Sequence, residues 1–124
     1  MSGVKQLEGL KASWAALAAG DMDKVASFYA EDMIFVLPGQ DDVLNGRTAF
    51  RGALDGISQA LPPGFEIKDL RYCPGDNEIV NVLEFTADKL PSGSQCTVLF
   101  KFGSDDLVTE ERWFVDTEQW KAAF

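Results

Sequence analysis

The spacing of apolar residues predicts helices in the first half of the chain. In the first stretch they recur at steps of three and four, the spacing of an amphipathic helix: Val4, Leu7, Leu10, Trp14 and Leu17. Gly20 ends this helix, because glycine adopts the left-handed conformation of a helix end without strain. Asp21 caps a short second helix that extends to Tyr29, and a third helix ends before Pro62.

Short apolar runs separated by turn residues predict strands in the rest of the chain. One strand, at 33–37, lies between the second and third helices, and a polar loop follows it at 40–42. Asp116 can cap a final helix while Gln119 reaches back to the cap. The order α-α-β-α-β-β-β-β-α predicts an α+β fold, with helices packed over the concave face of a curved antiparallel sheet. The four strands after the third helix are expected at 65–73, 79–88, 95–102 and 107–115.

The strands lack the clean alternation expected of a sheet with one wet face. In the last strand Leu107, Trp113 and Val115 share one face, whereas Val108 and Phe114 lie on the other. Both faces are therefore apolar. We expect the helices to cover one face and a second copy of the chain to cover the other, which gives a homodimer.

Composition excludes several classes of function. The chain has 124 residues, the length of a single domain over 1–124, and its formal net charge is −9. Acidic residues are spread along the chain and basic residues do not cluster, so we expect no nucleic-acid partner. No apolar run is long enough for a membrane span, and Cys73 and Cys96 are too few for a disulfide framework. We therefore expect a cytoplasmic protein with reduced cysteines.

The sequence contains no histidine, which limits its chemistry. Ser-His-Asp and Cys-His nucleophilic sites are excluded, as are the usual His-bearing zinc and iron sites. The adjacent Asp41 and Asp42 are weak evidence for a metal ion, because two carboxylates alone make a poor site. We expect no metal and no cofactor, so any proton transfer must use a carboxyl, phenol, amine or thiol group.

Several motifs resemble one superfamily. The segments WAALAAGDMD at 14–23 and FYAED at 28–32 resemble the opening signature of the nuclear transport factor 2-like superfamily, and NGR at 45–47 its next landmark. The segment ERWFVD at 111–116 is similar to the last strand of the SnoaL-like branch. This resemblance implies a cone-shaped sheet wrapped around a pocket, usually in a dimer. Members include ketosteroid isomerases, polyketide cyclases, dehydratases, epoxide hydrolases and non-catalytic binding or assembly domains.

The ketosteroid isomerase site of that superfamily does not carry over to this chain. In an ungapped placement on residues 15–17, its tyrosine position holds Ser13, its base position Leu37 and its acid position Val98. A leucine cannot take a proton. The resemblance therefore implies that this chain is not a ketosteroid isomerase.

The same placement directs mostly apolar side chains into the cone. Such a lining is typical of a site for a small hydrophobic molecule, although bulky side chains could instead fill the cone as a solid core. The ligand-binding residues predicted in this way are Trp14, Tyr29, Phe35, Leu37, Asn81, Leu83, Phe85, Val98, Phe100 and Trp113.

Two polar residues on this face are candidates for chemistry. Asn81 either bonds neighbouring backbone or holds the oxygen of a ligand, since a buried amide without partners is costly. Glu111 is the candidate catalytic residue, because a carboxyl near Trp113 in an apolar site would have a raised pKa. Its alternative role is a rim residue in water.

Three functions remain open from the sequence. The first is a cofactor-independent isomerase, cyclase or dehydratase of a lipophilic carbonyl compound, with Glu111 moving the proton and Asn81 polarising the oxygen. The second is a non-catalytic module that binds a hydrophobic small molecule. The third is a dimeric assembly domain that uses the outer sheet face. A desolvated titratable group inside a cavity would favour the enzyme.

Overall fold

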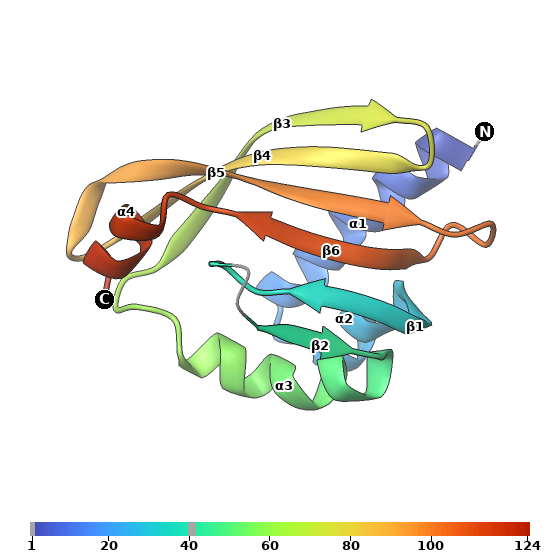
Figure 1. The fold of residues 1–124 in the computed structure, drawn as a ribbon, viewed down its shortest axis with the longest axis horizontal. Helices are drawn as coiled ribbons and strands as arrows, with labels where there is room; N and C mark the ends of the chain where they lie inside the picture. The colour runs from blue at the N-terminus through green and yellow to red at the C-terminus, as the bar shows by residue number, and fades with distance from the viewer. Residues whose placement is uncertain (1, 40–41) are drawn as a thin grey trace.

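The computed structural model describes residues 2–39 and 42–124, and within them four helices pack around a curved, unclosed sheet of six strands (Figure 1). This architecture confirms the α+β fold expected from the sequence. The helices are α1 (Ser2–Ala18), α2 (Met22–Ser27), α3 (Arg47–Gln59) and α4 (Thr117–Ala122). The strands are β1 (Tyr29–Val36), β2 (Val43–Asn45), β3 (Glu66–Gly75), β4 (Glu78–Ala87), β5 (Leu90–Phe102) and β6 (Val108–Phe114).

The sheet has the order β2-β1-β6-β5-β4-β3, so β1 and β6, which lie far apart in the sequence, are neighbouring strands. Neighbouring strands are antiparallel except β1 and β6, which are parallel. The expected all-antiparallel sheet is therefore wrong at this one pair. No hairpin joins β1 to β6, so no tight turn sets their relative direction.

Three segments differ from their predicted structure. The strand expected at 95–102 begins at Leu90, so the loop expected around Pro91–Gly93 is part of β5. The second helix ends at Ser27, and Tyr29 begins β1 instead of ending the helix. The short strand β2 was not predicted, because three residues are too few to show an apolar alternation. In the predicted loop at 40–42, which includes the Asp41–Asp42 pair, Gln40 and Asp41 lie outside the described residues.

Both predicted helix caps are present. Asp21 accepts a hydrogen bond from the backbone of Lys24, and Asp116 accepts from the backbones of Glu118 and Gln119. The side chain of Gln119 does not reach back to the cap, because its oxygen accepts a hydrogen bond from the Ser94 hydroxyl. This bond ties α4 to β5.

A β-bulge changes which face of β6 holds Val108. The register runs from Lys101 opposite Glu110 to Phe102 opposite Val108, so β6 has one extra residue there. Val108 consequently lies in the core and is buried, rather than on the outer face as the alternation suggested. The dimer was expected partly because Val108 was placed on the outer face, and the position of Val108 in the core removes that part of the argument.

None of the helices among the described residues is long and apolar enough to cross a membrane.

Candidate functional site

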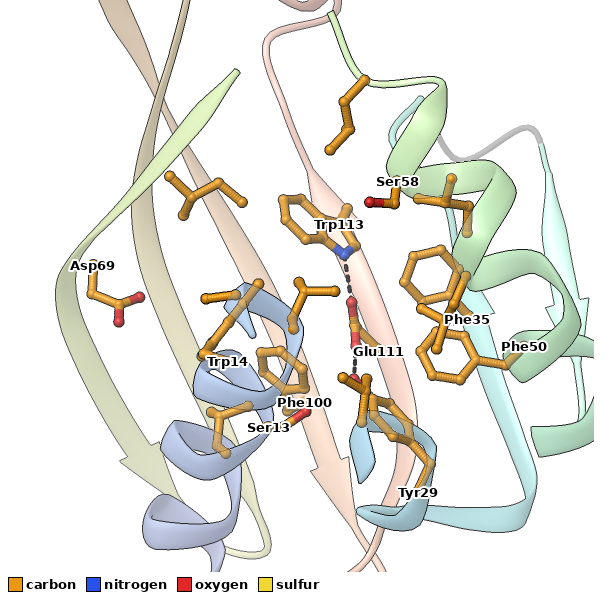
Figure 2. Close-up of a pocket in the computed structure, with 18 of the residues that line it drawn as sticks. Ser13, Trp14, Tyr29, Phe35, Phe50, Ser58, Asp69, Phe100, Glu111 and Trp113 are labelled. Atoms are coloured by element: carbon orange, nitrogen blue, oxygen red, sulfur yellow. Dashed lines mark hydrogen bonds between the residues drawn. The ribbon is translucent and has the colours of Figure 1, made fainter. Parts of the chain in front are cut away.

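A cavity of about 480 Å³ lies between the inner face of the sheet and the helices α1 and α3 (Figure 2). Its wall is mostly aliphatic and aromatic, with contributions from α1, α2, α3, β1, β3, β5 and β6. Asp69 on β3 and Ser58 on α3 belong to the lining and are exposed, so the cavity reaches solvent where these two residues lie. Its volume is within the range of small-molecule sites.

Glu111 is a buried carboxyl group on the wall of this cavity (Figure 2). The Trp113 indole donates a hydrogen bond to Glu111 Oε2 over 2.6 Å, and the Tyr29 hydroxyl donates to Oε1. The parallel pairing of β1 with β6 sets Tyr29 opposite Val108, from where its side chain reaches Glu111. Trp113 follows two residues later on the same face of β6 as Glu111.

Burial is the main cause of the unusual pKa of Glu111. It raises the pKa of Glu111 to about 7, while the hydrogen bonds from Tyr29 and Trp113 act in the opposite direction. Burial also raises the pKa of Tyr29 well above its ordinary value, and the charge of Glu111 adds to this effect. Tyr29 therefore keeps its proton and acts as a donor, whereas the raised pKa of Glu111 makes both its protonated and its ionised form accessible near neutral pH.

Asn81 lies behind the cavity wall instead of in it. Its oxygen accepts a hydrogen bond from the Trp14 indole over 3.0 Å, and its amide donates to the Arg71 carbonyl over 3.1 Å. Asn81 is fully buried and does not line the cavity. The amide therefore makes the backbone bond considered as one alternative, and it also fixes the ring of Trp14 edge-on to Trp113, with centroids 6.3 Å apart.

The structure brings together some of the predicted site residues and separates others. Four do not line the cavity besides Asn81: Leu83, Phe85 and Val98 are packed in the core, and Leu37 follows the end of β1. A ligand contact for any of the ten predicted residues stays a prediction. Those that do line the cavity are Trp14, Tyr29, Phe35, Phe100, Glu111 and Trp113.

The sequence reasoning missed the contribution of α3 and β3. Leu54, Ile57 and Ser58 of α3 and Ile67 and Asp69 of β3 line the cavity. The signal for α3 was available, since Phe50, Leu54 and Ile57 recur at helical spacing and all line the cavity. No comparable pattern marks β3.

The described residues hold no group of three or more acidic or cysteine side chains that could bind a metal ion. Both cysteines are free, Cys73 exposed and Cys96 buried. Burial raises the pKa of the Cys96 thiol to about 11, so it is a poor nucleophile. The titratable side chains that line the cavity are the carboxyl groups of Glu111 and Asp69 and the hydroxyl of Tyr29.

The chain belongs to the SnoaL-like domain family, whose profile matches residues 10–111. This membership agrees with the resemblance to the SnoaL-like branch seen in the motifs. No curated protein matches the chain.

Solved structures share the NTF2-like cone fold. An LEH-like epoxide hydrolase from M. tuberculosis has a TM-score of 0.78 at 17% identity, over 99% of this chain and 92% of that one. TerC, crystallised with polyporic acid, has a TM-score of 0.76 at 15% identity, over 95% and 96% of the two chains. An NTF-2-like protein of unknown function from Burkholderia xenovorans LB400 has a TM-score of 0.70 at 25% identity, over 93% and 85%. These likenesses show the fold.

Proposed function

We propose that the cavity binds a small hydrophobic carbonyl compound and that Glu111 transfers a proton on it without a cofactor. The observation that carries this proposal is a buried carboxyl group, with a pKa of about 7, on the wall of an apolar cavity. A general acid–base works best when its pKa is near the operating pH, because both forms are then available. Glu111 can therefore take a proton and return it in one turnover.

The proposed step begins with Glu111 ionised. A carbon–hydrogen bond next to the ligand carbonyl breaks, the proton forms a new bond to a carboxylate oxygen, and the electron pair moves to the carbonyl oxygen as an enolate. Each carboxylate oxygen has a second lone pair, so the bonds from Tyr29 and Trp113 leave acceptor capacity for this proton. The Ser13 hydroxyl, buried in the cavity wall, is the donor we assign to the ligand oxygen in place of Asn81. Its hydrogen bond with the Tyr29 side chain has to be exchanged for one to the ligand.

Proteins of the same fold support this type of function. An epoxide hydrolase and a protein crystallised with polyporic acid both place small-molecule binding on this architecture. Isomerisation, cyclisation and dehydration share the enolate step and differ in the bonds that form or break after it. We propose this group of reactions rather than one of them.

A second candidate, a dimeric assembly or binding domain, is favoured by the outer sheet face. Val43 and Phe114 are exposed there by 44% and 40% of their surface. We propose that this face joins two copies of the chain in the cytoplasm, where Cys73 and Cys96 stay reduced. A monomer in sedimentation at micromolar concentration would contradict the dimer.

Deuterium exchange tests the proton transfer without knowledge of the natural substrate. Bicyclic ketones such as 1-tetralone are incubated with the protein in deuterium oxide, and exchange beside the carbonyl is followed by NMR. We expect the protein to accelerate exchange and Glu111→Gln to lose about 100-fold of the acceleration. Glu110→Gln is the matched control, because Glu110 is the preceding residue of β6 and pairs with Lys101, outside the cavity.

Ligand binding is measured on the same samples by chemical-shift changes. Ketones that bind without exchange in the wild-type protein would support the non-catalytic binding module. Equal exchange in the wild type and in Glu111→Gln would overturn the role given to Glu111.

A further inference from the structure

We infer that the cavity accepts uncharged ligands and excludes anionic ones, through a lining that holds carboxyl groups and no basic group. This inference rests on the proposed function, because it names the ligand class of the same cavity. Among the lining residues the carboxyl groups are Glu111 and Asp69, and none of the lining residues is lysine or arginine. Tyr29 is the other lining residue with a titratable side chain.

The two carboxyl groups lie in different parts of the cavity. Glu111 on β6 is buried, while Asp69 on β3 is exposed where the cavity meets solvent (Figure 2). An anionic ligand therefore meets one like charge on entry and a second when it is bound. Repulsion between like charges is strong in the apolar interior, where little water screens it.

No cation among the described residues is placed to compensate for an anion. Arg47 donates to the backbone oxygen of Tyr29 over 3.3 Å and does not line the cavity. Lys11 lies over the ring of Tyr72, 5.4 Å from its centroid, and does not line the cavity either. A buried anion would thus lose its hydration without gaining a cationic partner, which is unfavourable.

The cavity does not require a cationic ligand. Both oxygens of Glu111 already accept hydrogen bonds from neutral donors, so its charge is stabilised by Tyr29 and Trp113. The remaining polar groups of the lining include the hydroxyls of Ser13 and Ser58, which can donate or accept. These groups match an uncharged molecule with one or two oxygen atoms.

A pair of nearly isosteric fluorescent probes tests this charge selection. The anion 8-anilinonaphthalene-1-sulfonate is compared with the uncharged 8-anilinonaphthalene-1-sulfonamide by fluorescence titration at about pH 8 and about 0.15 M salt. We expect the sulfonamide to bind at least about tenfold more tightly. Glu111→Gln and Asp69→Asn should each reduce this ratio several-fold. Glu8→Gln, which removes one exposed carboxyl group from α1, should leave the ratio unchanged.

The outcomes separate the inference from the proposed function. If neither probe binds, the ligand-binding function itself is contradicted, and the inference with it. If the sulfonate binds as tightly as the sulfonamide, the charge selection is overturned while ligand binding stands. An equal change in Glu8→Gln would assign the effect to net charge and overturn the inference. If Glu111→Gln fails to fold, as judged by circular dichroism, Asp69→Asn still decides.

Discussion

The inner face of the sheet has two ends that are built differently. At the end covered by α4, Phe85 packs against Trp120 and Phe65, with ring centroids 5.3 and 5.9 Å away. At the end covered by α1 and α3, the same face is left open as the cavity that contains Glu111. The packed end is a filled hydrophobic core, whereas the open end has the carboxyl group of Glu111 on the wall of the cavity. One sheet thus combines a tightly packed region with a region that forms the wall of a cavity.

The largest effect in this comparison is expected from matched leucine truncations. Leu83→Ala removes a fully buried side chain from the packed region and should lower the free energy of unfolding by about 4 kcal/mol. Leu54→Ala removes a side chain that already borders the cavity and should cost about 2 kcal/mol, because fewer packing contacts are lost. Urea denaturation measures both. Equal losses would show that the two ends are packed alike.

The pH dependence of stability should give the next largest effect. The folded-state pKa of Glu111 is about 7, above its ordinary value of 4.5, so the folded state binds more protons between these values. Stability should therefore fall as the pH rises through this window, by about 3 kcal/mol from this group. Glu111→Gln should remove that part of the decrease, so urea denaturation near pH 4.5 and near pH 8 should give a smaller difference than in the wild type. The same decrease in both proteins would mean that Glu111 is not desolvated.

The smallest effect concerns the hydrogen bond that lowers the pKa of Glu111. Tyr29→Phe removes this bond and should raise the pKa of Glu111 by roughly one unit. Infrared titration of the carboxyl stretch measures the change. Tyr72→Phe is the control, because the Tyr72 hydroxyl donates to Asp69 instead, over 2.8 Å. A shift of the Glu111 pKa in Tyr72→Phe but not in Tyr29→Phe would contradict the role given to the hydrogen bond from Tyr29.

Much of the fold could be predicted from the sequence, because most elements carry their own local signal. The first helix has a regular apolar stripe, and Asp21 and Asp116 mark helix starts. The errors lie where local and long-range effects compete. Tyr29 continues the helical spacing of the second helix, yet pairing with Val108 draws it into β1. The bulge in β6 adds one residue that no alternation pattern reveals.

The site was predicted only in part for the same reason. Glu111 and Trp113 are two residues apart on a strand, so their shared face follows from the sequence. The bond from Tyr29 to Glu111 joins residues 82 positions apart and depends on the β1–β6 pairing. Asn81 was recognised as a buried amide, but its partner Trp14 could not be predicted without the packing of α1.

The parallel pairing of β1 with β6 has a consequence for how the molecule is made. The hairpins from β3 to β5 can form as soon as they are synthesised, whereas the pairing of β1 with β6 must wait until β6 has been made. Closing so long a loop costs entropy and slows folding. A nascent chain that stops before Val108 lacks the strand β6, which joins β1 to β5, and with it the carboxyl group of Glu111. The sheet and the cavity wall that carries Glu111 are therefore completed in the same step of folding.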